Sequence, residues 1–221
     1  MGKRKTTRPR RRRVLANVLL GLVLLVLMAL LLVMLLFYRP GSYLGVSERD
    51  PQRLIRNAQG FSRKTQEFVS AVWSERPFPL ELTEDEINGY LAAVNDPALW
   101  ERLPLKFESW RRIFTSTKLR NVQVFLREGR VTVCGEVTWA GLDVVLSLIG
   151  APHVDNEGRV RLDVHSLRAG LVPVPSALAG ELLRSIRDRP IPAKSSRWRV
   201  VSVEVKPGKV LLVGEPHSRD D

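Results

Sequence analysis

The pattern of hydrophobic and polar positions begins with one long apolar run. Val14 to Tyr38 contains no charged side chain, and its one strongly polar group is Asn17. At about 1.5 Å per residue, a helix over this run is about 37 Å long and exceeds a hydrocarbon core of about 30 Å. A buried helix of a soluble protein would show a polar face, which this run lacks. We therefore expect a transmembrane helix over 14–38.

The end of the run indicates an uncleaved signal-anchor. The apolar part of a signal peptide is about 7–15 residues long and precedes a small-residue cleavage site. This run is longer and ends in Phe37-Tyr38-Arg39-Pro40-Gly41, which has no such site. Tyr38 and Tyr43 are expected at the outer membrane interface, where tyrosine is enriched.

After a juxtamembrane linker over 39–49, hydrophobic positions recur with the helical period. Asp50 and Pro51 form a helix start, with Asp50 as the N-cap. An apolar stripe then recurs at steps of three and four: Leu54, Ala58, Phe61, Thr65, Phe68 and Val72. Thr83 and Glu86 form a capping box before a second amphipathic helix over about 84–94. A third helix is expected over about 177–187, after Pro173 and Pro175 interrupt the strand pattern.

From residue 119 the hydrophobic period changes to two, which is typical of half-buried antiparallel strands. One hairpin turns at Glu128-Gly129, and later strands cover 142–149, about 160–164, 199–205 and 209–213. On the strand after the first turn, the valines and Trp139 are expected on the apolar face, and Cys134 and Glu136 on the polar face. The fold class is therefore α+β, with one meandering sheet of five or six strands in a domain over 50–214 and a polar tail over 215–221.

The charge distribution orients the chain in the membrane. Net charge is +12, but eight of the 35 basic residues precede the apolar run, in a basic tail over 1–13 that holds Arg10, Arg11, Arg12 and Arg13. The remaining 27 basic residues face 23 acidic ones, so the rest of the chain carries only +4. By the positive-inside rule the tail is cytoplasmic, where its arginines contact anionic lipids, and the main domain is extracytoplasmic. The tail lacks interleaved aromatic residues, so no nucleic-acid partner is expected.

Catalytic and metal-binding patterns are weak. Cys134 is the single cysteine, so it forms no intramolecular disulfide, and nothing near it in the sequence activates its thiol. The three histidines are isolated; His165 shares a strand face with Asp163, which is better explained as a solvated surface than as a metal site. Glu84, Asp85 and Glu86 are explained as helix-start residues. We expect a non-enzymatic protein without a metal or cofactor.

Three stretches together resemble a known family. They are Leu82–Leu91, with the pattern LTxxExNxxL, the strand pair around Val133–Ile149, and Val160–Leu183, where an alternating strand leads into a helix. Their order resembles bacterial membrane-anchored TULIP-like (tubular lipid-binding) proteins, including the YpmS-like group, over roughly residues 50–214. The resemblance implies a strongly curved antiparallel sheet wrapped around a helix, with an apolar groove for acyl chains and no catalytic residues.

These expectations define a candidate ligand site. If the helix over 177–187 faces the inner side of the sheet, a groove is lined by Val133, Val137, Trp139, Leu178, Leu182 and Ile186. The expected function is passive binding of a lipid or other apolar ligand beside the cell (inner) membrane. Two alternatives remain: the same residues fill an ordinary core in an envelope scaffold that binds envelope proteins, or, with less support, the domain is an envelope hydrolase.

Overall fold

The structure is a computed structural model of the chain. It describes residues 9–39, 43, 50–74, 76–101, 103, 119–139, 141–175, 180 and 198–216. Within these ranges, the side chains of 9–19, 72, 73, 97, 139 and 198 are not described. The expected helix over 177–187 therefore lies outside the described residues, apart from Gly180.

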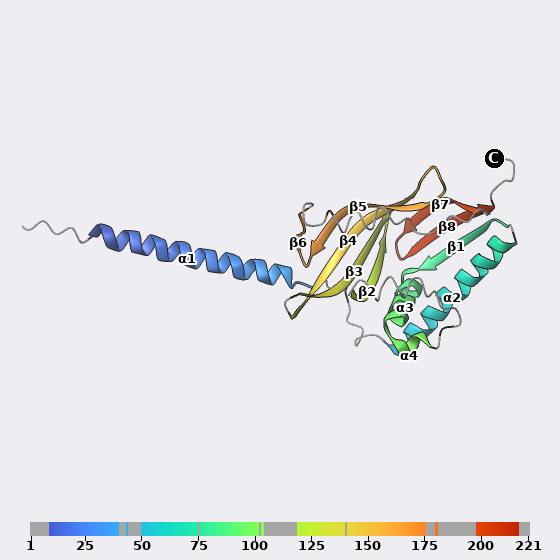
Figure 1. Ribbon diagram of the computed structural model, residues 1–221, viewed down its shortest axis with the longest axis horizontal. Coiled ribbons are helices and arrows are strands. Elements are labelled where there is room, and N and C mark those ends of the chain that lie inside the picture. Colours follow the sequence, from blue (N-terminus) through green and yellow to red (C-terminus); the bar gives the residue numbers. More distant parts are fainter. Residues whose placement is uncertain are drawn as a thin grey trace, which may run out of the picture.

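A single long helix, α1 (Pro9–Leu36), forms the N-terminal part of the described chain. It extends away from the other elements and meets them at one end of a β-sheet (Figure 1). Its large side chains from Leu20 to Met34 are exposed, whereas Leu35 and Leu36 at its end are half-buried. Within the part of the chain that the structure describes, no helix combines the length and apolarity needed to cross a membrane.

The remaining elements confirm the α+β class but form two antiparallel sheets, so the expectation of one meandering sheet was wrong. The three-stranded sheet has the order β1 (Phe78–Thr83), β8 (Lys209–Pro216), β7 (Trp198–Lys206). The five-stranded sheet has the order β2 (Arg120–Arg127), β3 (Arg130–Trp139), β4 (Leu142–Val154), β5 (Val160–Ala169), β6 (Val172–Pro173). The second sheet exists because β1, where the sequence pattern indicated no strand, pairs with the C-terminal hairpin. Pro79 is tolerated there because β1 is an edge strand.

Three helices cover the side of the molecule away from α1: α2 (Pro51–Trp73), α3 (Glu84–Asn95) and the short α4 (Pro97–Trp100) (Figure 1). Asp50 caps α2 as expected, since its carboxylate accepts from the main-chain N–H of Gln52 at 2.9 Å. The predicted stripe of α2 is confirmed where its side chains are described, with Ala58 and Phe61 in the core. Phe61 stacks on Tyr90 of α3 at a ring-centroid distance of 4.4 Å.

Gly89 sets how closely α2 and α3 approach. A Cβ atom at this position would lie 2.6 Å from the Cβ of Asn57 and 2.9 Å from the main-chain oxygen of Leu54. Both distances are shorter than van der Waals contact, so a larger residue would push the helices apart. The close approach buries Tyr90, Ala93 and Val94 against the three-stranded sheet, together with Leu80 and Leu82 of β1.

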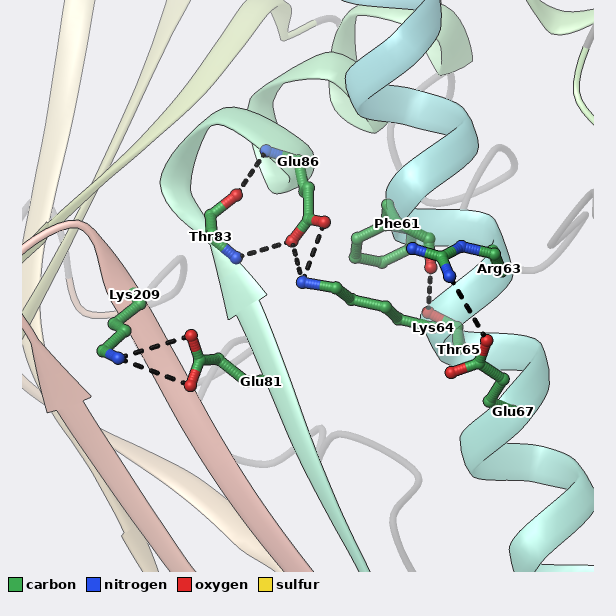
Figure 2. Close-up of polar contacts among 9 residues, drawn as sticks. All are labelled: Phe61, Arg63, Lys64, Thr65, Glu67, Glu81, Thr83, Glu86 and Lys209. Carbon is green, nitrogen blue, oxygen red and sulfur yellow. Dashed lines mark hydrogen bonds and ion pairs between the residues drawn. The ribbon is translucent and has the colours of Figure 1, made fainter.

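The start of α3 has the predicted capping box. Thr83 accepts from the main-chain N–H of Glu86 at 3.2 Å, and the carboxylate of Glu86 accepts from the N–H of Thr83 at 2.8 Å. Figure 2 shows that Lys64 of α2 also reaches this carboxylate, at 2.9 Å. On the neighbouring strands Lys209 pairs with Glu81 at 3.3 Å, which links β8 to β1. The capping box therefore also fixes α3 against α2.

Helix α3 protects the free edge of the five-stranded sheet. The side-chain amide of Asn88 donates to the main-chain oxygen of Val124 at 2.7 Å, and its oxygen accepts from the N–H of Val124 at 2.6 Å. Two positions after Val124 on β2, the main-chain N–H of Leu126 donates to the carboxylate of Glu84 at 2.7 Å. The main-chain oxygen of Leu126 accepts from the N–H of Gly208 at 3.1 Å. These groups take the place of a further strand, so this part of β2 is closed to edge-to-edge pairing.

The two sheets are joined where their hairpin turns meet. In addition to the bond from Gly208, the N–H of Gly129 donates to the main-chain oxygen of Val205 at 2.9 Å. At the opposite end of β7, the N–H of Val200 donates to the oxygen of Gly158, in the turn between β4 and β5, at 3.2 Å. Val160 and Val200 pack together beneath this contact. Long β4 and β5 therefore bridge from the three-stranded sheet to α1.

Candidate functional site

The consecutive acidic residues at the start of α3 all have structural partners. Glu84 accepts from the main chain of β2 and pairs with Arg127 at 3.2 Å. Asp85 pairs with Arg53 of α2 at 2.6 Å, and Glu86 belongs to the capping box. These contacts agree with the interpretation of the cluster as helix-start residues.

Among the described residues, the histidines form no metal site. His165 is exposed, and its Nδ1 lies 2.8 Å from the main-chain oxygen of Asp163. In the described ranges, no group of three or more histidine, cysteine or acidic side chains is arranged to hold a metal ion.

The structure describes only some of the residues that were expected to line the groove. Val133 and Val137 lie on one face of β3, as predicted, and both are half-buried. Their partners in β4 are Leu148 and Val144. Trp139 ends β3, but its side chain is not described. Leu178, Leu182 and Ile186 lie outside the described residues, so the structure does not test whether they face Val133 and Val137.

The expected lipid-contacting arginines are placed only by their backbone. Arg10, Arg11, Arg12 and Arg13 belong to the first turns of α1. Their side chains are outside the description, so their contacts stay a prediction.

The best-defined unusual feature is the junction between α1 and the five-stranded sheet. The main-chain N–H of Leu171, in the turn between β5 and β6, donates to the carbonyl oxygen of Leu35 at 2.9 Å. This oxygen belongs to the last turn of α1, where carbonyl groups lack a partner within the helix, and it also accepts from the N–H of Tyr38 at 3.4 Å. The neighbouring Gly170 also donates to the oxygen of Val145 at 2.8 Å, which holds the turn on β4.

Gly170 is required at this junction for two reasons. Its φ of +58° lies in the left-handed region, which favours glycine. In addition, a Cβ atom here would lie 2.3 Å from the main-chain oxygen of Leu36 and 2.4 Å from that of Leu35. A side chain would therefore separate the turn from the helix. The close approach of two backbones positions α1 against the sheet.

Two described residues that follow α1, Arg39 and Tyr43, contact β2 and β3 of the same sheet. The guanidinium of Arg39 lies 3.5 Å from the carboxylate of Glu136 on β3. The side-chain amide of Asn121 donates to the same carboxylate at 2.6 Å. Tyr43 donates from its hydroxyl to the main-chain oxygen of Asn121 at 2.8 Å. Asn121 has a φ of +52°, at the irregularity of β2; its main-chain oxygen meets Tyr43 and its side-chain amide meets Glu136.

This attachment corrects two expectations from the sequence. Cys134 and Glu136 were expected on a polar face, yet they are only 2% and 5% exposed. Tyr43 was expected at the membrane interface, but it is buried on this face with Cys134, Val145 and Phe125. The strand alternation was correct; what it could not show is that Tyr43 covers part of the second face. Burial raises the pKa of the Cys134 thiol to about 11, so this cysteine is a packing residue.

Charged side chains at the α1 end of the sheet are paired with one another. Arg120 of β2 lies 2.5 Å from Asp143 at the start of β4, and Thr138 donates to the same carboxylate at 2.8 Å. The hydrogen bond from Thr138, followed by the charges of Arg120 and Arg39, lowers the pKa of Asp143. Asp143 therefore stays ionised, and the pairs consolidate the β3–β4 hairpin beside Arg39.

Comparison with known proteins identifies no family for the chain. No protein-family model, no curated protein and no solved structure matches the chain. The resemblance to tubular lipid-binding proteins therefore stays a hypothesis that rests on the quoted stretches.

Sequence reasoning did not predict the junction. The pair of Leu35 with Leu171 joins residues 136 positions apart, and the pair of Arg39 with Glu136 joins residues 97 positions apart. One available signal was Gly170 between two strand-like stretches, which indicates a turn. A glycine in a turn does not by itself indicate that a helix end packs on it.

Proposed function

We propose that the chain is a single-pass membrane protein that holds an extracytoplasmic α+β domain directly against the outer membrane surface, where the domain binds a lipid or other apolar ligand without catalysing a reaction. The observation that carries the proposal is the junction of α1 with the five-stranded sheet. An anchor followed by a free linker would let the domain move away from the membrane. Here Leu171, Gly170 and Arg39 fasten the sheet within four residues of the end of α1.

The membrane-spanning part of the proposal rests on the sequence run Val14–Tyr38. Helix α1 includes this run up to Leu36, and its described large side chains project outward on all sides. Large exposed apolar surfaces mark contacts with a membrane or with another protein, and we assign this one to the membrane. Arg10 to Arg13 precede the run, so the positive-inside rule orients its N-terminus toward the cytoplasm.

The ligand-binding part rests on the face of β3 that carries Val133 and Val137. These side chains are only half-buried by the described residues, whereas Leu148 and Leu167 of the same face are buried. Val174, which follows β6, packs on Leu148 and Leu167 and donates from its N–H to the oxygen of Leu167 at 2.9 Å. Val174 therefore covers part of this face, three positions before the helix expected over 177–187. Acyl chains in such a position would gain about 0.8 kcal/mol per buried methylene group.

A site-specific photocrosslinker tests this proposal in the full chain in its membrane. Benzoylphenylalanine replaces Val133 in one variant and Thr132 in the control, because the two neighbours lie on opposite faces of β3 and both are farther than Val137 from the end of the sheet that α1 meets. After illumination, a lipid adduct on position 133 and none on position 132, seen by mass spectrometry, supports a ligand groove. Crosslinks from position 133 only to residues 177–187 of the same chain would instead support a filled core and the scaffold function.

A further inference from the structure

The end of the five-stranded sheet nearest α1 has an unusual concentration of exposed apolar side chains. Outside α1, five large hydrophobic side chains among the described residues are exposed: Tyr38, Val69, Leu142, Leu171 and Val201. Three of these, Tyr38, Leu142 and Leu171, lie where α1 meets the sheet. Their exposed fractions are 46%, 54% and 44%. We call these three residues the apolar tip.

We propose that the apolar tip inserts into the outer interface of the lipid bilayer and forms a second membrane contact beside the anchor. The inference rests on the proposed function, since it requires α1 to be in a membrane. The lipid surface is the one occupant we assign, because the tip continues the exposed apolar surface of α1, which runs from Leu20 to Met34.

The depth of Leu171 follows from its hydrogen bond. Its N–H lies 2.9 Å from the carbonyl oxygen of Leu35. Leu35 precedes Tyr38, the last residue of the apolar run, by three positions, which is about 4.5 Å along a helix axis. If Tyr38 lies at the interface, the turn that carries Leu171 is therefore at the same depth or slightly below it.

Leu142, at the start of β4, also lies near the end of α1. The hairpin between β3 and β4 and the turn between β5 and β6 both lie at the end of the sheet that α1 enters (Figure 1). Asp143, adjacent to Leu142, is close enough to Arg39 for its pKa to respond to that charge. Arg39 itself directly follows Tyr38. Both turns thus flank the point at which α1 leaves the membrane.

The charges around the tip do not oppose this contact. Arg39 pairs with Glu136, and Arg120 pairs with Asp143. An approaching lipid surface therefore meets ion pairs, and the exposed parts of both arginines suit the headgroup region, where long basic side chains extend toward phosphate. An unpaired carboxylate beside Leu142 would have been repelled by anionic lipids.

Spin-label accessibility in the full chain tests the proposal. Single labels replace Leu142, Leu171, Val201 and Met28 by cysteine in a Cys134→Ala background, reconstituted in phosphatidylcholine–phosphatidylglycerol vesicles. Val201 is the matched control, because it is 45% exposed and lies on β7 of the other sheet. Met28 reports on the anchor. We expect collisions with oxygen to exceed collisions with a water-soluble nickel complex at 142 and 171, as at 28, and the reverse at 201.

Three results would overturn the proposal, and they differ from one another. If 142 and 171 resemble 201 while 28 is lipid-like, the anchor stands and the tip does not contact lipid. If both oxygen and the nickel complex are excluded from labels at 142 and 171, the tip is covered by protein, either a partner or a second copy. If 28 is accessible to the nickel complex, the anchor and the tip contact both fail.

Discussion

The hydroxyl of Tyr43 donates a hydrogen bond of 2.8 Å to the main-chain oxygen of Asn121, across 78 positions of the chain. The tyrosine ring simultaneously packs on Cys134 and Val145 of the five-stranded sheet. The segment between α1 and the domain is thus held by a buried side chain as well as by the ion pair of Arg39 with Glu136.

The packing of Tyr43 on Cys134 predicts how the thiol reacts. With a pKa of about 11, only about one thiol in a thousand is ionised at pH 8, so the folded protein should react slowly with a thiol reagent such as dithiobis-nitrobenzoate. Tyr43→Ala should increase the reaction rate and destabilise the domain by about 2 kcal/mol. Tyr43→Phe keeps the packing, so its rate should stay close to that of the wild type. Equal reaction rates in all three proteins would contradict the inference that Tyr43 shields the thiol of Cys134.

The pairing of Asn88 with Val124 predicts that replacing this one side chain lowers the stability of the protein. Asn88→Leu removes both partners of the Val124 backbone and should destabilise the protein by about 2 kcal/mol in urea unfolding. Asn88→Asp should be less stable at pH 7 than at pH 4, relative to the wild type, because an ionised carboxylate faces the oxygen of Val124. Asn95→Leu, at the exposed end of α3, is the control and should cost less.

The close approach at Gly170 predicts a local loss of protection. Gly170→Ala should break the bond between Leu171 and Leu35, since the added Cβ would overlap the last turn of α1. Hydrogen exchange of the Leu171 amide should then accelerate. Gly208→Ala is a matched control: its φ of +76° imposes similar backbone strain, but nothing lies within 4 Å of the added atom. If both variants leave the Leu171 amide equally protected, the junction is not held by this contact.

The hydrogen bonds of the Asp155 carboxylate predict that the folded protein loses part of its stability in acid. This carboxylate accepts from Arg161 at 2.7 Å and from the main-chain N–H groups of Arg159 and Glu157, and these bonds lower its pKa to about 2. The folded-state pKa lies below the unfolded value of about 3.9, so the stabilisation is present above that pH and is lost as the pH falls toward 2. The urea midpoint of Asp155→Asn should therefore approach that of the wild type between pH 5 and pH 2. A constant difference over this range would contradict the assignment.

The orientation of α1 is also testable. A reporter that is active only outside the cytoplasm, fused after Asp221, should be active, and the purified protein should retain its basic N-terminus. Replacing Arg10 to Arg13 with neutral residues should reduce correct orientation, because these charges hold the tail in the cytoplasm. Activity of a cytoplasm-specific reporter on the wild-type chain would reverse the proposed topology.

Much of the local structure was predictable from sequence. The starts of α2 and α3 are set by Asp50 and by the capping box of Thr83 and Glu86, which act within three residues of the chain. The hairpin from β2 to β3 turns at Glu128-Gly129 as expected, with Gly129 at a φ of +66°. Such features depend on neighbours in sequence, so the pattern contains the information needed to predict them.

Tertiary structure alone decided how these pieces are assembled. The strand β1 joins a hairpin formed by the last strands, Asn88 pairs with a strand 36 positions away, and Tyr43 covers a strand face that alternation indicated as polar. Periodicity shows which residues share a face, but not which segment covers that face. The sequence by itself determined α2 and α3, the strands β2 to β5, β7 and β8, and the apolar run with its basic flank, but not β1, β6 or α4. The two-sheet arrangement and the junction at Gly170 arise from contacts between distant segments, whose partners no local pattern specifies.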